Sequence, residues 1–300
     1  MTTATANSKS LQIKAAFNRK GQPPVVHMSC PTPFHAGMLE AAGFAEYIFV
    51  GGDASLAICY GRAGTDVSLF EKVWLTRAFV EATNLPVLID SDELGKQGRA
   101  YIERAMNEYI RAGAAGWDMD DRDAPEDRTA AETVREAGIR AVYPVEHQVE
   151  RIKWAVEAKK AAGNPDFLIR TRCFALFAGK SLDETKERIQ AYQAAGSDVA
   201  YIAGPKNVEE VKELISAVDI PVTCPTAFVS PEIAQEIGLS EARYPYALHH
   251  AMNVFSWNFL MDFKERGFEV LKEFNEKYKD HPYMNLSNAP AHGVNRAAKA

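Results

Sequence analysis

Eight short apolar runs, spread over the whole chain, dominate the pattern of hydrophobic and polar positions. Polar and turn-forming residues bound each run, and most runs are separated by segments in which apolar residues recur with helical spacing. The runs cover residues 25–30, 47–52, 87–92, 116–121, 167–174, 199–204, 221–226 and 242–247. Short continuous apolar runs are typical of parallel strands that are buried on both faces. The pattern therefore predicts eight strands that alternate with helices.

The segments between the runs indicate helices, several of which end at glycine, the usual left-handed terminator. The clearest helical segments are residues 99–112, 145–162, 182–195 and 208–218, and the terminating residues are Gly43, Gly113, Gly163 and Gly196. This alternation predicts an α/β fold, the (β/α)8 TIM-type barrel. A doubly wound open sheet is the alternative, although no Gly-x-Gly-x-x-Gly turn opens the chain where a nucleotide site would need it.

We expect a single barrel domain over residues 9–282, between a flexible tail of residues 1–8 and a C-terminal tail of residues 283–300. The domain includes a helical C-terminal segment, residues 249–267, with large apolar side chains on more than one helical face. These are Met252, Val254, Phe255, Trp257, Phe259, Leu260, Met261 and Phe263. A helix that is apolar most of the way round needs partners on several sides. Either the segment packs on its own barrel, or it is swapped between the subunits of a homo-oligomer, a dimer or a homotetramer.

The composition of the chain indicates which binding partners and which cellular compartment to expect. Hydrophobic residues make up 47% of the chain and charged residues 25%, which is ordinary for a globular protein. The net charge of -6 is spread along the chain, so we expect neither a nucleic-acid nor a membrane partner. No apolar run approaches the ~20 residues of a membrane span, and the start lacks the regions of a signal peptide. The four cysteines lack zinc-like spacing, which favours reduced thiols in the cytoplasm.

Clustered carboxylates close the third and fourth apolar runs. Asp90 and Asp92 end one, and Asp118, Asp120 and Asp121 end the other. In a (β/α)8 barrel the function lies at these C-terminal strand ends. Converging carboxylates repel each other unless a cation neutralises them, and hard oxygen ligands suit Mg2+, with Mn2+ as the alternative. The runs therefore predict a metal at the barrel mouth that acts on a small anionic substrate, whereas a capped turn or a solvated charge run is the structural alternative.

Five segments along the chain carry recognisable motifs. Residues 43–52 hold a Gly-Phe pair before the second strand, residues 87–92 an Asp-x-Asp motif, and residues 114–121 a strand end of the form Gly-x-x-x-Asp-Asp. Residues 166–175 form a strand with two arginines, and residues 191–198 a helix end of the form Ala-Tyr-x-x-Ala-Gly. In order and spacing, these segments resemble the isocitrate lyase and phosphoenolpyruvate mutase superfamily over residues 15–263. In that superfamily the third motif has Glu in place of Asp120, and the fourth reads Ala-Arg-Thr-Asp-Ala.

The resemblance implies a role for each matching residue. Asp90 would bind the metal directly, and Asp92, Asp120 and Asp66 would hold metal-bound waters. Arg172 would bind a substrate carboxylate or the developing enolate oxygen through its guanidinium group. The other carboxylate would bind the backbone amides of three successive residues, Gly51, Gly52 and Asp53. His250 begins the helix after the last strand, on the rim side, and we add it to the substrate-binding residues.

The acid–base half of the family site is altered. The family lyases carry a Lys-Lys/Arg-Cys-Gly-His loop, whereas residues 122–133 contain neither Cys nor His. The proton donor must therefore differ, and the candidates are Glu132, which we assign as catalytic, His147, or a metal-bound water. After Arg172 the family's Thr-Asp is replaced by Cys173 and Phe174. The metal half of the site is kept.

The expected function is that of a Mg2+-dependent carbon–carbon lyase. A 2-hydroxy or 2-oxo acid chelates Mg2+, which stabilises the enolate left when a C–C bond breaks, by retro-aldol or Claisen-type cleavage or by decarboxylation. The substrate would be a small carboxylate, most simply a dicarboxylate. The alternatives are C–P bond hydrolysis or rearrangement of a phosphonopyruvate-like substrate, and a barrel that no longer catalyses.

Overall fold

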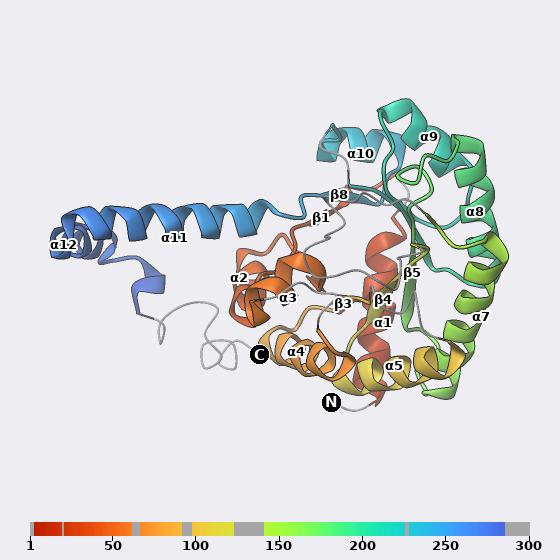
Figure 1. Cartoon of the computed structure of the whole chain (residues 1–300), viewed down its shortest axis with the longest axis horizontal. Coiled ribbons are helices and arrows are strands. Elements are labelled where there is room, and N and C mark those ends of the chain that lie inside the picture. Colours follow the sequence, from red (N-terminus) through yellow and green to blue (C-terminus); the bar gives the residue numbers. More distant parts are fainter. Residues whose placement is uncertain are drawn as a thin grey trace.

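The computed structural model describes residues 3–19, 21–61, 67–91, 98–122, 141–225 and 228–285. Within them, eight parallel strands form the centre of the molecule, and each overlaps one of the eight apolar runs (Figure 1). The strands are β1 Val25–His27, β2 Ile48–Val50, β3 Val87–Asp90, β4 Gly116–Asp120, β5 Leu168–Cys173, β6 Val199–Ile202, β7 Val222–Thr223 and β8 Glu241–Arg243.

The strands close into a ring. Six of them form one parallel ladder, β2-β3-β4-β5-β6-β7, and the remaining two pair as β1-β8. Single backbone hydrogen bonds connect the two pieces: the Cys30 N–H donates to the Phe49 carbonyl at 3.3 Å, and the Ser240 N–H donates to the Val222 carbonyl at 3.0 Å. The predicted (β/α)8 barrel is therefore confirmed.

Helices surround the strands, and Figure 1 shows α4, α5, α7 and α8 as a continuous outer layer. The outer helices are α2 Pro33–Ala42, α3 Gly52–Tyr60, α4 Leu69–Ala82, α5 Arg99–Ala112, α7 Val145–Ala161, α8 Leu182–Ala195, α9 Val208–Ser216 and α10 Pro231–Ile237. Most of the apolar core lies between this layer and the strands; Trp117 and Phe167, for example, meet edge to face there. Alternate residues of a strand point to opposite faces, so the intervening positions face the barrel interior.

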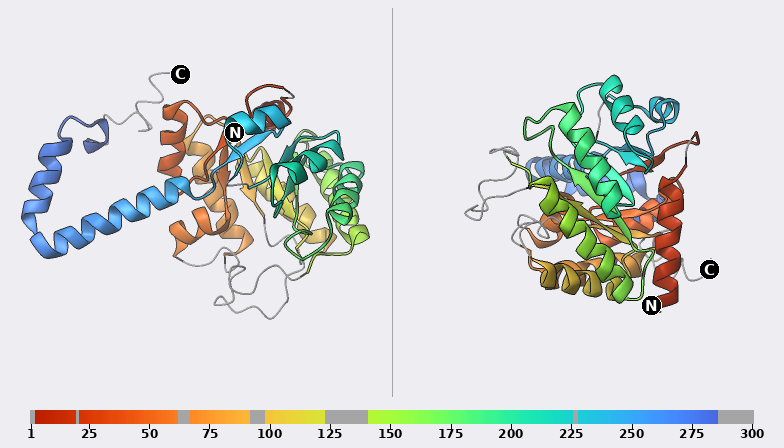
Figure 2. Two further views of the ribbon diagram at one scale, coloured as in Figure 1. Left: turned by 90° about the horizontal axis from the view of Figure 1, so that it is seen from above. Right: turned by 90° about the vertical axis from the view of Figure 1, so that its right-hand side faces the viewer.

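An additional helix, α1 (Thr3–Phe17), covers the N-terminal ends of the strands and lies along one side of the barrel in Figure 2. Its buried residues Ile13 and Phe17 pack on the first residues of several strands. The Ser10 hydroxyl donates to the Ala115 carbonyl at 2.9 Å. Residues 3–8, which we expected in a flexible tail, belong to this helix.

The C-terminal helices leave the barrel. Helix α11 (Ala247–Arg266) projects away from it, and α12 (Phe268–Tyr278) turns back, followed by a short 3-10 turn over Pro282–Met284 (Figures 1 and 2). Large apolar side chains of α11 are exposed, Trp257 by 62%. The alternative in which this segment packs on its own barrel is therefore wrong. The described helices include none that is long and apolar enough to cross a membrane.

Candidate functional site

Two buried carboxylates meet at the C-terminal ends of adjacent strands. Asp90 ends β3 and Asp120 ends β4, and both are almost fully buried. The parallel register sets Asp90 opposite Asp118, and Asp120 opposite Arg172 on β5. The side chains of Asp90, Asp120 and Arg172 therefore meet at the mouth of the barrel.

The Arg172 guanidinium joins the two carboxylates. Its Nη1 donates to Asp90 Oδ2 at 2.8 Å, its Nη2 donates to Asp120 Oδ2 at 2.8 Å, and its Nε donates to Asp120 Oδ1. Arg122 also donates from Nε to Asp120 Oδ2, at 2.6 Å. Buried carboxylates are tolerated where they are paired and hydrogen-bonded. The charges of two carboxylates and two guanidinium groups thus balance at this rim. We call these four residues, Asp90, Asp120, Arg122 and Arg172, the rim cluster.

Gly51 places a helix start directly against the rim cluster. Its φ is 138°, and a Cβ built there would lie 2.2 Å from the Cβ of Asp90, so only glycine fits. Helix α3 begins at the next residue, Gly52. The first amide groups of a helix carry partial positive charge and attract anions. The Gly51 N–H itself donates to Ser55 Oγ at 3.3 Å, which leaves the amides of Gly52 and Asp53 as the better candidates for a substrate carboxylate.

Asp121 faces away from the rim cluster, towards the helices. It accepts hydrogen bonds from the Phe174 N–H and from the Tyr192 hydroxyl of α8, both at 2.8 Å. Burial raises the pKa of the Asp121 carboxyl to about 6, although both hydrogen bonds oppose that shift. This carboxyl therefore ties the ends of β4 and β5 to α8 and does not point into the site.

The remaining predicted residues are only partly placed. Asp66, Asp92 and Glu132 lie outside the described residues. His250 is exposed at the start of α11, where its ring stacks on Tyr246 at 5.8 Å, and no described contact joins it to the rim cluster. His147 is exposed in the first turn of α7. The described residues alone contain no group of three or more His, Cys, Asp or Glu side chains that could hold a metal ion.

A second layer of charge that the sequence did not predict lies inside the barrel, and it includes Asp118, which we expected among the carboxylates at the rim. Arg170 binds both carboxylate oxygens of Asp118, at 2.7 and 2.9 Å, and both side chains are fully buried. The Glu241 carboxylate accepts from the Tyr47 hydroxyl and lies 3.5 Å from Arg170 and 3.4 Å from Arg243. We call these five residues the interior network. A signal for it existed: Arg170 with Arg172, and Glu241 with Arg243, are charged at alternate positions of apolar strands.

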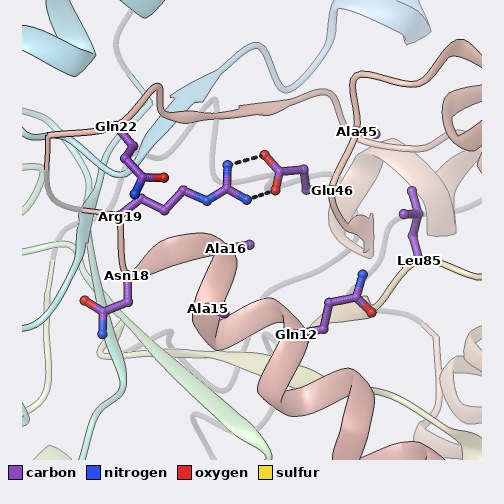
Figure 3. Close-up of a pocket in the computed structure, with 9 residues that line it drawn as sticks. All are labelled: Gln12, Ala15, Ala16, Asn18, Arg19, Gln22, Ala45, Glu46 and Leu85. Carbon is purple, nitrogen blue, oxygen red and sulfur yellow. Dashed lines mark hydrogen bonds and ion pairs between the residues drawn. The ribbon is translucent and has the colours of Figure 1, made fainter.

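A shallow pocket at the other end of the barrel is unrelated to this chemistry. Arg19 and Glu46 form an ion pair across it, with Nη1 2.8 Å from Oε1 (Figure 3). The pocket lies beside the end of α1 and the loops that precede β2 and β3, and it contains no residue of the rim cluster or the interior network.

Comparison with known proteins decides the family. The family model for phosphoenolpyruvate phosphomutase matches residues 16–253. The chain belongs to this family. It is 28% identical over 227 residues to 2-methylisocitrate lyase of Escherichia coli (strain K12), with 73% of each chain covered. It is 33% identical over 173 residues to 2,3-dimethylmalate lyase of Eubacterium barkeri, with 55% of this chain and 56% of the relative covered.

A solved structure supports the same assignment of the fold. A crystal structure of 2,3-dimethylmalate lyase, described as a member of the PEP mutase/isocitrate lyase superfamily, aligns with a TM-score of 0.74 at 20% identity and covers 86% of this chain and 87% of its own. The predicted superfamily is thus confirmed, as is the predicted enzyme class, a carbon–carbon lyase of the isocitrate lyase and phosphoenolpyruvate mutase type.

Proposed function

We propose that this enzyme is a Mg2+-dependent lyase that cleaves a C–C bond in a small 2-hydroxy or 2-oxo dicarboxylate. The observation that carries the proposal is the rim cluster, in which Asp90 and Asp120 meet a bidentate arginine at the C-terminal mouth of the barrel. The lyase names of the relatives, 2-methylisocitrate lyase and 2,3-dimethylmalate lyase, support a substrate of this class.

The donor set suits a divalent cation. Asp90 and Asp120 offer only carboxylate oxygens, they lie on adjacent strands, and the Arg172 guanidinium compensates their negative charge. We infer that they hold Mg2+, with Mn2+ as the alternative, together with Asp92 and Asp66. When bound, the ion supplies a Lewis acid that stabilises negative charge on the substrate oxygens.

The side chains and amides of the chain then orient the substrate. The Arg172 fork suits a planar carboxylate because it can make two parallel hydrogen bonds. Asp90 and Asp120 would hold the cation, whose charge would compensate theirs, and the Arg172 guanidinium could then bind the substrate. The N-terminal amides of α3, at Gly52 and Asp53, would receive a carboxylate, and His250 would contact the substrate from the rim. Glu132 remains our candidate for the proton donor.

The second candidate is chemistry at a C–P bond, either hydrolysis or a mutase reaction on a phosphonopyruvate-like acid. The specific observation in its favour is the description of the matching family model, which names a phosphomutase. The same cation and the same arginine would hold such a substrate, so the bond that is broken distinguishes the two candidates.

The test uses metal-stripped protein with a panel of 2-oxo and 2-hydroxy dicarboxylates and phosphonopyruvate, with and without Mg2+, followed by NMR. We expect Mg2+-dependent cleavage that falls at least about 100-fold in Asp90→Ala, because one carboxylate ligand is lost. The matched control is Asp219→Ala, a change in the loop that precedes β7, at the opposite ends of the strands from the rim. Phosphate release would favour the second candidate. Turnover that is equal without metal would contradict both, and no turnover on any acid would favour a barrel that does not catalyse.

We also infer that the enzyme is a homo-oligomer in which α11 contacts a second copy. The exposed apolar side chains of α11, led by Trp257, support this inference because patches of this kind mark interaction surfaces. The compartment we propose is the cytoplasm, because all four cysteines are free thiols.

A further inference from the structure

Three buried polar side chains inside the barrel each carry one atom that has no hydrogen-bond partner in the described part of the chain. The atoms are Thr223 Oγ1, Arg243 Nε and His27 Nδ1. The Arg243 side chain is 4% exposed and the His27 side chain 1%, and Thr223 is fully buried. Buried donors and acceptors are nearly always paired, since an unpaired one keeps its full desolvation cost. Three of them together therefore point to a polar group that the fold is built to receive.

The three residues lie side by side on neighbouring strands. His27 of β1 is directly opposite Arg243 of β8 in the parallel register. A backbone hydrogen bond joins β8 to β7, which carries Thr223, and Thr223 is opposite Tyr201 of β6. The side chains of His27, Arg243 and Tyr201 point into the barrel. His27 and Arg243 both lie against the Phe49 ring, and Arg243 also lies over the Tyr201 ring. The unpaired atoms thus share one sector of the interior, formed by β7, β8 and β1.

Arg243 is the least compensated cation of this sector. Its only described ion partner is Glu241, at 3.4 Å from Nη1. That carboxylate also accepts from the Tyr47 hydroxyl and lies 3.5 Å from Arg170, whereas Arg170 has a further, bidentate partner in Asp118. The Arg243 guanidinium otherwise lies over aromatic rings. An anionic group at this sector would therefore gain a charge-assisted hydrogen bond from a guanidinium that is already desolvated.

The sector adjoins the rim cluster. The Tyr201 ring centroid lies 5.2 Å from Cζ of Arg243 and 5.7 Å from Cζ of Arg172, so the two guanidinium groups flank the same ring. His27 brings no competing charge, because burial and the nearby Arg243 and Arg170 hold its pKa well below the usual range. Its Nδ1 lies 3.6 Å from Oε1 of Glu241, and a neutral imidazole can donate from that atom to an anion without altering the charge balance.

We propose that Arg243, Thr223 and His27 form the subsite for the second carboxylate of the dicarboxylate substrate, the one remote from the metal-chelating end. The Arg243 guanidinium and the Thr223 hydroxyl donate to this carboxylate, and the imidazole of His27 completes the set of donors. The assignment rests on the proposed function, and it makes Arg243 the residue that selects a dicarboxylate over a monocarboxylate.

The test compares acids of equal length that differ only in one terminal carboxylate. Calorimetry in the presence of Mg2+ measures the affinity of 2-oxoglutarate against 2-oxopentanoate, and of malate against 2-hydroxybutanoate. We expect Arg243→Met to weaken dicarboxylate binding by about 10- to 100-fold and to leave monocarboxylate binding unchanged, since a hydrogen bond to a charged group is lost. Thr223→Val, nearly isosteric, should shift the same ratio in the same direction, but less.

The control variant is Arg19→Met, which removes an arginine at the opposite end of the barrel (Figure 3). The proposal is overturned if Arg243→Met and Thr223→Val leave the dicarboxylate-to-monocarboxylate ratio of the wild type, if they weaken both acids equally, or if the wild type binds neither dicarboxylate. The proposed function fails differently, through loss of metal-dependent turnover, which is measured on the wild type alone. Binding and turnover therefore separate the two failures.

Discussion

The Arg172 guanidinium contacts both candidate metal-binding carboxylates, Asp90 and Asp120, through three donors. A divalent cation at these carboxylates would take over the charge compensation that Arg172 provides. Arginine and cation therefore compete for the same oxygens, and the stability of the protein should depend on which of them is present.

Replacing Arg172 with methionine tests this competition. Without divalent ions, we expect Arg172→Met to lower the free energy of unfolding by about 3–5 kcal/mol, because two buried carboxylates lose a partner. Saturating Mg2+ should restore most of the loss, so the stabilisation by Mg2+ becomes larger in the variant than in the wild type. Urea unfolding in EDTA and in Mg2+ measures both values.

The matched control for this prediction is Arg19→Met, which breaks a partly exposed ion pair with Glu46 far from the rim. It should cost no more than about 1 kcal/mol, and the cost should be the same with and without Mg2+. If Mg2+ stabilised Arg172→Met no more than it stabilises the wild type, Asp90 and Asp120 would not share a cation.

At the residue scale, the sequence predicts the rim but not what lies beneath it. Asp90 and Asp120 are recognisable because carboxylates that end an apolar run must lie at the strand ends. Asp118 stands among the carboxylates that close the fourth run, so the sequence groups it with the rim. Only the barrel shows that it pairs with Arg170 below the rim. The partners of a buried charge come from strands distant in the chain, so no local pattern specifies them; Glu241 lies 71 residues beyond Arg170.

Helix α1 illustrates the same limit for an element. Its apolar residues cover the open end of a barrel, a partner that exists only after the strands have closed, so its sequence alone does not distinguish a packed helix from a tail. Strands and outer helices are easier to predict, because the spacing of apolar residues within each one is typical of its type and most helices end at a glycine. Gly113 and Gly196, for example, end α5 and α8 in the left-handed conformation, with φ of 93° and 106°.

Phe17 tests how much the packing of α1 contributes to stability. It is fully buried, its ring lies 5.4 Å from that of Tyr47, and the Arg170 guanidinium lies over it. We expect Phe17→Ala to reduce the free energy of unfolding by about 3–5 kcal/mol, as for other large-to-small changes in a core. Leu11→Ala, on the same helix but 50% exposed, should cost less than about 1 kcal/mol. Equal effects of the two variants in urea unfolding would mean that α1 does not seal the barrel.

At the scale of the whole molecule, the barrel and its C-terminal arm differ in how they bury apolar surface. The barrel encloses its own apolar core, whereas α11 extends away from the barrel and exposes large apolar side chains to solvent (Figures 1 and 2). On this arm, Val254, Phe255, Trp257 and Leu260 are each more than half exposed. A monomer rarely displays so much contiguous apolar surface, which is why we infer a second copy against it.

Trp257→Glu is the sharpest test of that inference. A buried tryptophan commonly contributes 2 kcal/mol or more to an interface, and a carboxylate in its place adds a desolvation cost. We expect the dissociation constant of the oligomer to rise by at least about 30-fold, measured by analytical ultracentrifugation across a dilution series. The barrel should stay folded by circular dichroism, because Trp257 is 62% exposed on a single chain.

The matched control is Lys272→Glu, a change at an exposed residue of α12, which should leave the dissociation constant of the oligomer unchanged. A wild type that sediments as a monomer at every concentration would show that the arm receives a different partner, and the apolar side chains of α11 would then be the surface on which to capture it.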